Sequence, residues 1–176
     1  MRGESKTRRL TLMALLTAVA LIIFTVEAQL PPLAPIPGIK LGLANIITVY
    51  AMFRLGPRDA LCILLCRIFM GSIFSGQMMT LFFSLSGGLL CWLVMLGMRK
   101  LVTEDQIWLC SAVGAVAHNV GQVLAAMWIS GTASMIVYLP VLLVSGVLAG
   151  LFTGFCAQFL LKRLKKTPGE QPNSKP

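Results

Sequence analysis

Charge is scarce in this sequence, and acidic charge is scarcer still. Of the 176 residues, only 12% are charged and 57% are hydrophobic, and the mean hydropathy is +0.84. Soluble domains carry about 25% charged residues, so this composition excludes a soluble globular enzyme. Disorder of the whole chain is excluded too, since disordered chains have little apolar content. The composition instead predicts an all-α integral membrane protein.

The few acids and the single histidine also limit the chemistry. Asp59 and Asp105 are the only aspartates, and no clustered carboxylates suited to magnesium and diphosphate occur. The nucleotide-binding pattern GxxxxGK[ST] is absent, and His118 has no intramembrane acid beside it in the sequence. All five cysteines lie in apolar runs without metal-ligand spacing, which is typical of small buried hydrophobes. We therefore expect no catalytic residues, no metal and no cofactor, and hence not an enzyme.

Six apolar segments are separated by short breaker sequences. A membrane helix needs about 20 residues, so six helices and their short loops occupy nearly the whole chain. Gly56-Pro57, Gly76-Gln77 and Gly131-Thr132 are predicted turns. The expected spans are Leu10–Ala28, Leu41–Leu55, Asp59–Ser75, Thr80–Met98, Ile107–Ile129 and Met135–Leu161.

The distribution of Lys and Arg predicts the orientation. Thirteen of them flank the spans on one side, Lys40 alone is on the other, and Arg67 lies within a span. Because cytoplasmic loops are rich in Lys and Arg, both termini are expected in the cytoplasm. The expected organisation is a basic cytoplasmic N-terminus (1–9), a six-helix membrane domain (10–162) and a basic, disordered cytoplasmic tail (163–176). Basic ends of this kind contact membrane lipids rather than nucleic acid.

Four polar residues are expected near the middle of the bilayer. Arg67 lies in the third span, and His118, Asn119 and Gln122 lie in the fifth, where His118 and Gln122 share one helical face. Ionisable groups at this depth usually face a protein interior or a cavity. We expect Asn119 and Gln122 to offer oxygens to Arg67 and to form a substrate-binding pocket with it. The alternative is a network that only joins helices, and for His118 the two interpretations weigh equally.

Further polar residues cluster at the outer ends of the spans. The loop at 29–40 holds four of the nine prolines and is expected to be extended, packed on the protein and extracytoplasmic. Glu27, Lys40 and Asn45 lie around it, and Gln77 caps the outer end of the third and fourth spans. Glu27 and Lys40 could meet as an ion pair or reach separately into the headgroup region. We expect these residues to ring an outward-facing pocket with the loop as its lid. The cations Lys40 and Arg67 favour a ligand with an anionic or polar head.

Small residues recur at four-residue intervals in two spans. Gly146, Gly150 and Gly154 form a ladder that lets helix backbones approach closely, and internal packing is the expected use. Ala14 and Ala18 share the same spacing in the first span. For these alanines, internal packing and docking of another membrane protein both remain open.

Three runs resemble one known family. They are Pro37–Asn45 after a first helix that ends in Glu, Ser84–Gly88, and His118–Gln122. Together they are similar to the Gx transporter family, often labelled heptaprenyl diphosphate synthase component I, over about residues 8–162. This family is similar to the substrate-binding S-components of energy-coupling factor (ECF) transporters. The resemblance implies a six-helix bundle, an outward pocket capped by the first loop, and a partner made of a coupling protein with two ATPases.

The resemblance also implies a docking role and leaves the function open. In S-components an alanine pair four apart on the first helix docks to the coupling protein, and Ala14 and Ala18 match that spacing. The expected function is a substrate-binding subunit for uptake of a small molecule. The alternatives are a non-catalytic membrane component associated with heptaprenyl diphosphate or menaquinone synthesis, and a membrane anchor of a quinone- or flavin-linked electron-transfer system.

Overall fold

The computed structural model describes residues 6–29, 42–76 and 78–165. These residues form six α-helices and two short 3₁₀ helices. In chain order they are α1 (Lys6–Gln29), α2 (Asn45–Arg54), α3 (Pro57–Ser75), α4 (Met78–Met98), η1 (Glu104–Gln106), α5 (Ile107–Ser130), η2 (Ala133–Tyr138) and α6 (Leu139–Lys165). The expected all-α class is thus observed throughout the described part of the chain.

Most helix boundaries follow the breakers in the sequence. Pro57 is the first residue of α3, and Gly76 and Gly131 end α3 and α5 in the left-handed conformation, each with φ 65°. Glycine has no Cβ, so it adopts this conformation without strain. At the N-terminus α1 begins at Lys6, four residues before the predicted span. The disordered tail expected over 163–176 is wrong for residues 163–165, which continue α6, and its remainder lies outside the described residues.

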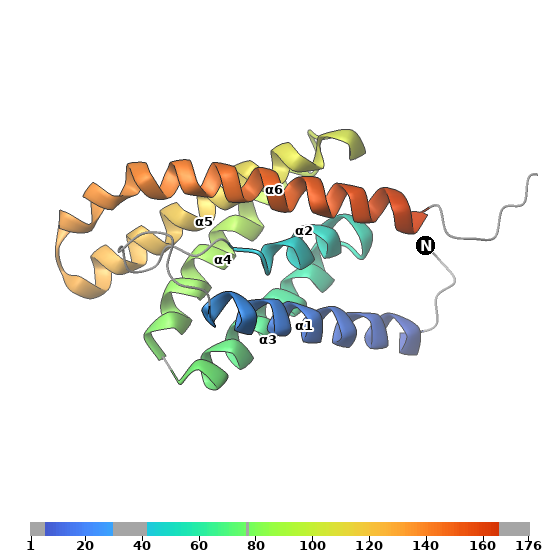
Figure 1. The fold of residues 1–176 in the computed structure, drawn as a ribbon, viewed down its shortest axis with the longest axis horizontal. Coiled ribbons are helices and arrows are strands. Elements are labelled where there is room, and N and C mark those ends of the chain that lie inside the picture. The colour runs from blue at the N-terminus through green and yellow to red at the C-terminus, as the bar shows by residue number, and fades with distance from the viewer. Residues whose placement is uncertain (1–5, 30–41, 77, 166–176) are drawn as a thin grey trace, which may run out of the picture.

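The helices pass back and forth between two ends of the molecule, as Figure 1 shows. Helix α2 lies in the middle, between α1 on one side and α6 on the other (Figure 1). Residues 47–52 of α2 are buried, and the side chains of Met52, Ile63 and Met95 belong to the core around them. The short helix α2 is therefore the centre around which the longer helices pack.

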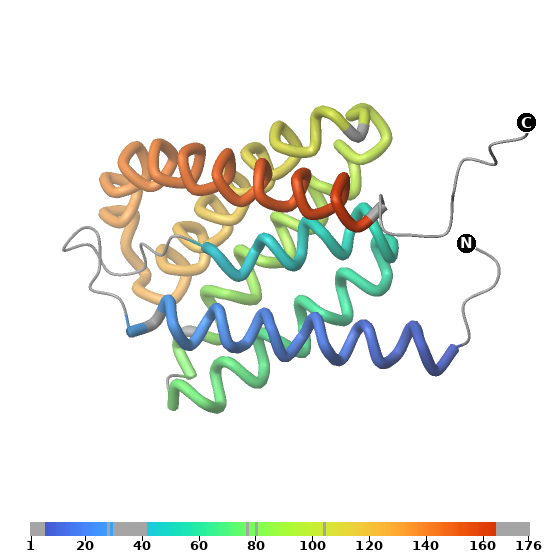
Figure 2. Tube along the Cα trace, turned by 45° about the vertical axis from the view of Figure 1, so that its right-hand side comes forward, coloured from blue at the N-terminus to red at the C-terminus, as the bar shows by residue number. Residues whose placement is uncertain are grey.

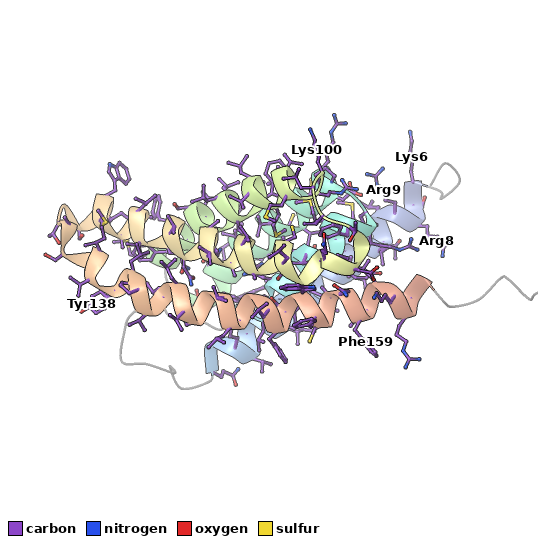
Figure 3. All side chains as sticks on the ribbon, turned by 90° about the horizontal axis from the view of Figure 1, so that it is seen from above. Lys6, Arg8, Arg9, Lys100, Tyr138 and Phe159 are labelled. Atoms are coloured by element: carbon purple, nitrogen blue, oxygen red, sulfur yellow. The ribbon has the colours of Figure 1, made fainter. Side chains whose placement is uncertain are left out.

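The start of α1 and the end of α6 lie at the same end of the molecule (Figure 2). The junctions between α2 and α3 and between α4 and α5 also lie there. In Figure 3 the labelled Lys6, Arg8, Arg9 and Lys100 gather toward this end, and Tyr138 lies toward the other. We call the first end the basic end. The labelled basic residues thus lie toward one end of the helix bundle, as the distribution of Lys and Arg predicts.

Two ion pairs fasten helices at the basic end. The Arg9 guanidinium donates two hydrogen bonds of 2.6 Å to the two carboxylate oxygens of Asp59, which joins α1 to α3. Lys162 Nζ lies 2.7 Å from Asp105 Oδ1, next to η1, and this hydrogen bond lowers the pKa of the Asp105 carboxyl.

Within the described residues, four segments are long and apolar enough to cross a membrane. They are Lys6–Glu27, Leu81–Met98, Ile107–Ser130 and Ala133–Leu164. Helix α2 has ten residues and spans about 15 Å, half of a hydrocarbon core of about 30 Å. Helix α3 has 19 residues but carries Arg58, Asp59 and Arg67. The chain has the helices of a membrane protein, and the count of six complete spans stays a prediction.

Candidate functional site

Close packing of α5 against its two neighbours shapes the interior. On the α4 side, Ser86 Oγ donates to the Gly121 carbonyl at 2.8 Å, and a methyl group at Gly121 would lie 2.9 Å from the Cα of Gly87. On the α6 side, methyl groups at Gly150 and Gly154 would lie 2.7 and 2.6 Å from backbone atoms of α5. The glycine ladder therefore serves internal packing, as expected.

A cavity of about 60 Å³ lies among all six α-helices. A site needs about 10–15 Å³ for one water molecule, so this space accepts a few small groups. Helices α1 and α3 supply Phe24, Glu27, Arg67, Ile68 and Ser72, while the chain around the start of α2 supplies Gly42 and Asn45. The remaining lining residues, from α4, α5 and α6, are Ser84, Ala115, His118, Asn119, Gln122, Gly146 and Ala149.

Arg67 is the buried cation of this cavity. Its side chain leaves the middle of α3, and the residue is 7% exposed. The guanidinium Nη2 donates to Asn45 Oδ1 at 3.4 Å, which is a long hydrogen bond. The buried Nε donor has no acceptor among the described residues. A buried donor without a partner is costly, so Arg67 holds hydrogen-bonding capacity that an added oxygen atom would satisfy.

Glu27 is the buried acid of the same cavity. It lies near the end of α1, is 8% exposed, and accepts a hydrogen bond of 2.5 Å from the Gly42 backbone N–H. Gly42 has φ 70°, a left-handed conformation that favours glycine. Its carbonyl also accepts from the Asn45 N–H at 2.9 Å. Gly42 thus connects the acid of α1 to the first turn of α2, where Asn45 meets Arg67.

The predicted contact between Asn119 and Arg67 is not observed. We expected Asn119 and Gln122 to accept from Arg67, but the Asn119 amide donates to the Leu142 carbonyl and packs against Gly146 of α6. Asn45 supplies the acceptor for Arg67 instead. The correction has a physical reason: Asn119 lies on the side of α5 that faces α6, where its amide completes a helix junction.

His118 and Gln122 pack against α4 at Gly87. A methyl group at Gly87 would lie 3.0 Å from His118 Cε1 and 2.9 Å from Gln122 Cγ. Both residues line the cavity. Glycine at position 87 therefore leaves the room that these two side chains need.

Six of the predicted pocket residues line one cavity: Glu27, Asn45, Arg67, His118, Asn119 and Gln122. Lys40 and Gln77, together with the loop at 30–41 and its expected role as a lid, lie outside the described residues. The sequence analysis did not assign Ser72 or Ser84 to the pocket. A signal was available for Ser84, because it begins one of the three runs that carry the family resemblance. No comparable signal pointed to Ser72.

Ala14 and Ala18 are both exposed on α1, away from the cavity. They lie one helical turn apart on the same face. Neither alanine is used in the core, so this face of α1 is open to lipid or to another protein.

Comparison with known proteins identifies the family. The family model described as heptaprenyl diphosphate synthase component I matches residues 16–160, most of the chain. The chain belongs to this family. No curated protein and no solved structure matches it. The match confirms the family indicated by the three runs, and the heptaprenyl diphosphate synthase component I chain is a membrane protein with a cavity among its helices.

This heptaprenyl diphosphate synthase component I cavity is lined by groups of several chemical kinds. It offers one guanidinium, one carboxylate, an imidazole, three amides and two hydroxyls within apolar walls. Ligand sites typically combine apolar walls with a few polar groups that orient the ligand. No group of three or more His, Cys, Asp or Glu residues that could hold a metal ion occurs within the described residues.

Proposed function

We propose that the chain is a membrane substrate-binding subunit, similar to an S-component, that captures a small molecule for uptake through an ECF-type transporter. The central cavity is the proposed capture site. In this proposal the chain catalyses no reaction, spans the bacterial cytoplasmic membrane several times and keeps both termini in the cytoplasm.

The buried guanidinium of Arg67 carries this proposal. An arginine facing lipid at mid-depth costs at least about 2.5–3.5 kcal/mol on insertion scales, which explains why Arg67 turns inward. Its Nε nevertheless finds no acceptor among the described residues. A purely structural arginine would be expected to satisfy its donors within the protein. A ligand oxygen would complete this arrangement, and the polar residues around Arg67 would orient that ligand.

The face of α1 supports the proposed partner. Docking of a coupling protein with two ATPases needs an uncommitted helix surface, and exposed Ala14 and Ala18 allow another helix to approach closely. The proposal assigns this face to the coupling protein.

Anionic lipids would contact the basic end, where Lys6 and Lys100 lie.

The family description favours a second candidate function. It describes one component of a heptaprenyl diphosphate synthase, which implies a second component as partner. In this alternative the chain is a non-catalytic membrane component that accompanies a synthase of prenyl diphosphates, and the cavity would contact a substrate or product of that enzyme.

Native mass spectrometry tests the capture site. The wild-type protein would be purified in mild detergent from its own membrane, incubated with the small-molecule fraction of its cells, and weighed intact. We expect a retained compound on the wild type and on Arg58→Gln, a matched control at an exposed position of the same helix. Arg67→Gln should unfold at a similar temperature but retain at least about tenfold less compound. Equal retention by a folded Arg67→Gln protein, or no retention by the wild type, would contradict the capture site.

A further inference from the structure

The cavity holds two buried charges of opposite sign that do not pair with each other. Arg67 and Glu27 both line it, and each is less than a tenth exposed. The ion pairs among the described residues join Arg9 to Asp59 and Lys162 to Asp105, both outside the cavity. The formal charges of the described acidic residue and arginine in the lining, Glu27 and Arg67, sum to zero.

Each of the two charges has hydrogen-bonding capacity left. Among the described residues, Arg67 Nε has no acceptor and its Nη2 has only the long bond to Asn45. From the same part of the chain Glu27 accepts one hydrogen bond, from Gly42, while a carboxylate has about four acceptor positions. The cavity therefore presents a donor on α3 and an acceptor on α1. A ligand that satisfies both must itself carry an acceptor and a donor.

The two opposite charges of the cavity favour a ligand of zero net charge over a diphosphate. A diphosphate brings several negative charges, and a single arginine would have to neutralise them beside the buried carboxylate of Glu27. Like charges repel strongly where water is excluded. A ligand of zero net charge leaves the balance between Arg67 and Glu27 unchanged.

Cavity size points the same way. About 60 Å³ holds roughly four water-sized groups, which suits an amide or an amino acid end. A diphosphate has nine non-hydrogen atoms. Phe24 and Ile68 supply apolar walls for the part of the ligand next to this end.

We infer that the cavity binds the compact end of a compound of zero net charge, in which an oxygen accepts from Arg67 and an N–H group donates to Glu27. This inference rests on the proposed capture function and specifies its substrate class. Amides and zwitterionic amino acids share this chemistry. Acetate carries only the acceptor, and inorganic diphosphate carries the wrong charge.

Thermal unfolding of the full chain in detergent tests the inference with four probes: acetamide, glycine, acetate and inorganic diphosphate. A compound that binds only the folded state raises the unfolding midpoint with concentration. For each probe the response of Arg67→Gln would be subtracted, which removes effects of the probe on the solvent. We expect acetamide or glycine to bind the wild type about tenfold more tightly than acetate, and diphosphate not to bind. Which of the first two binds better distinguishes an amide from a zwitterion.

Glu27→Gln supplies the decisive comparison. Removing the acid leaves Arg67 as the only described charge of the cavity, so acetate should now bind about tenfold more tightly than to the wild type. Asp105→Asn, at an exposed position outside the cavity, is the matched control and should leave every affinity unchanged. Tighter binding of diphosphate than of acetamide and glycine would overturn the inference, as would no response to either neutral probe or no gain for acetate in Glu27→Gln.

These outcomes are separable from failure of the proposed function. If the neutral probes bind but the chain never associates with ATPases, the substrate class stands and the transport role fails. If ATPases are found while diphosphate is the preferred probe, the transport role stands and the substrate class fails.

Discussion

The guanidinium of Arg67 in α3 donates to the side-chain oxygen of Asn45 in the first turn of α2, at 3.4 Å. This contact joins the helix with the buried charge to the short central helix of the bundle. An amide oxygen accepts a hydrogen bond without neutralising the cation. The contact therefore orients the Arg67 guanidinium without supplying a counter-charge, and the proposed function depends on this property.

Asn45→Asp tests this arrangement by placing a carboxylate at the position that already contacts Arg67. A carboxylate at position 45 would lie within reach of Nη2 and pair with Arg67, which satisfies the cation from within the protein. We expect ligand retention to fall at least about tenfold, while the unfolding temperature stays equal or rises. Asn45→Ala removes the acceptor without adding charge, so it should be less stable than Asn45→Asp. Native mass spectrometry and thermal unfolding measure the two effects, and full retention by Asn45→Asp would count against the role of Arg67.

Gly121→Ala tests the close approach of α4 and α5. The new methyl group would lie 2.9 Å from Gly87 Cα and 2.9 Å from the Ser86 carbonyl oxygen, and both are backbone atoms. Overpacking of this kind costs about 1–3 kcal/mol. Gly97→Ala is the matched control, since nothing lies within 4 Å of the added methyl group. It should leave stability unchanged or raise it by about 0.5–1 kcal/mol, because alanine favours helix. Equal unfolding temperatures for Gly121→Ala and Gly97→Ala would contradict the close approach of α4 and α5.

Single cysteines at Lys100 and Thr132 test the orientation. Lys100 lies near the basic end, and Thr132 follows α5 at the turn before η2. In a background where the five native cysteines are replaced by serine or alanine, an impermeant thiol reagent added to intact cells should label position 132 and not position 100. The reverse pattern would invert the topology, and labelling of both positions would be incompatible with the predicted spans.

Much of the fold follows from local signals in the sequence. Gly76, Pro57 and Gly131 mark helix ends because their conformational preferences act within a few residues. The pairing of Arg9 with Asp59 could not be predicted in the same way, since fifty residues separate the partners. The length of α2 was also overestimated, because the apolar residues from Leu41 onward continue the hydrophobic pattern before the helix begins at Asn45.

The sequence predicted several of the residues that line the cavity, but not the hydrogen-bond partners of those residues. Depth along the helices placed Arg67 and His118 at one level, and both line the same cavity. The partner of Arg67 depends on how each helix is rotated about its axis. Asn119 proved to face α6, and Asn45 took its place. Apolar segments give little information on rotation, because lipid-facing and protein-facing positions carry similar residues.

Affinity purification of the tagged protein from its own membranes tests the central claim most directly. Quantitative mass spectrometry of the co-purifying proteins should find a membrane coupling protein and two ATPases. Ala14→Phe with Ala18→Phe, on the exposed face of α1, should lose these partners while still retaining ligand. A soluble prenyl diphosphate synthase as the stoichiometric partner, with no ATPase present, would contradict the transport function and establish the alternative.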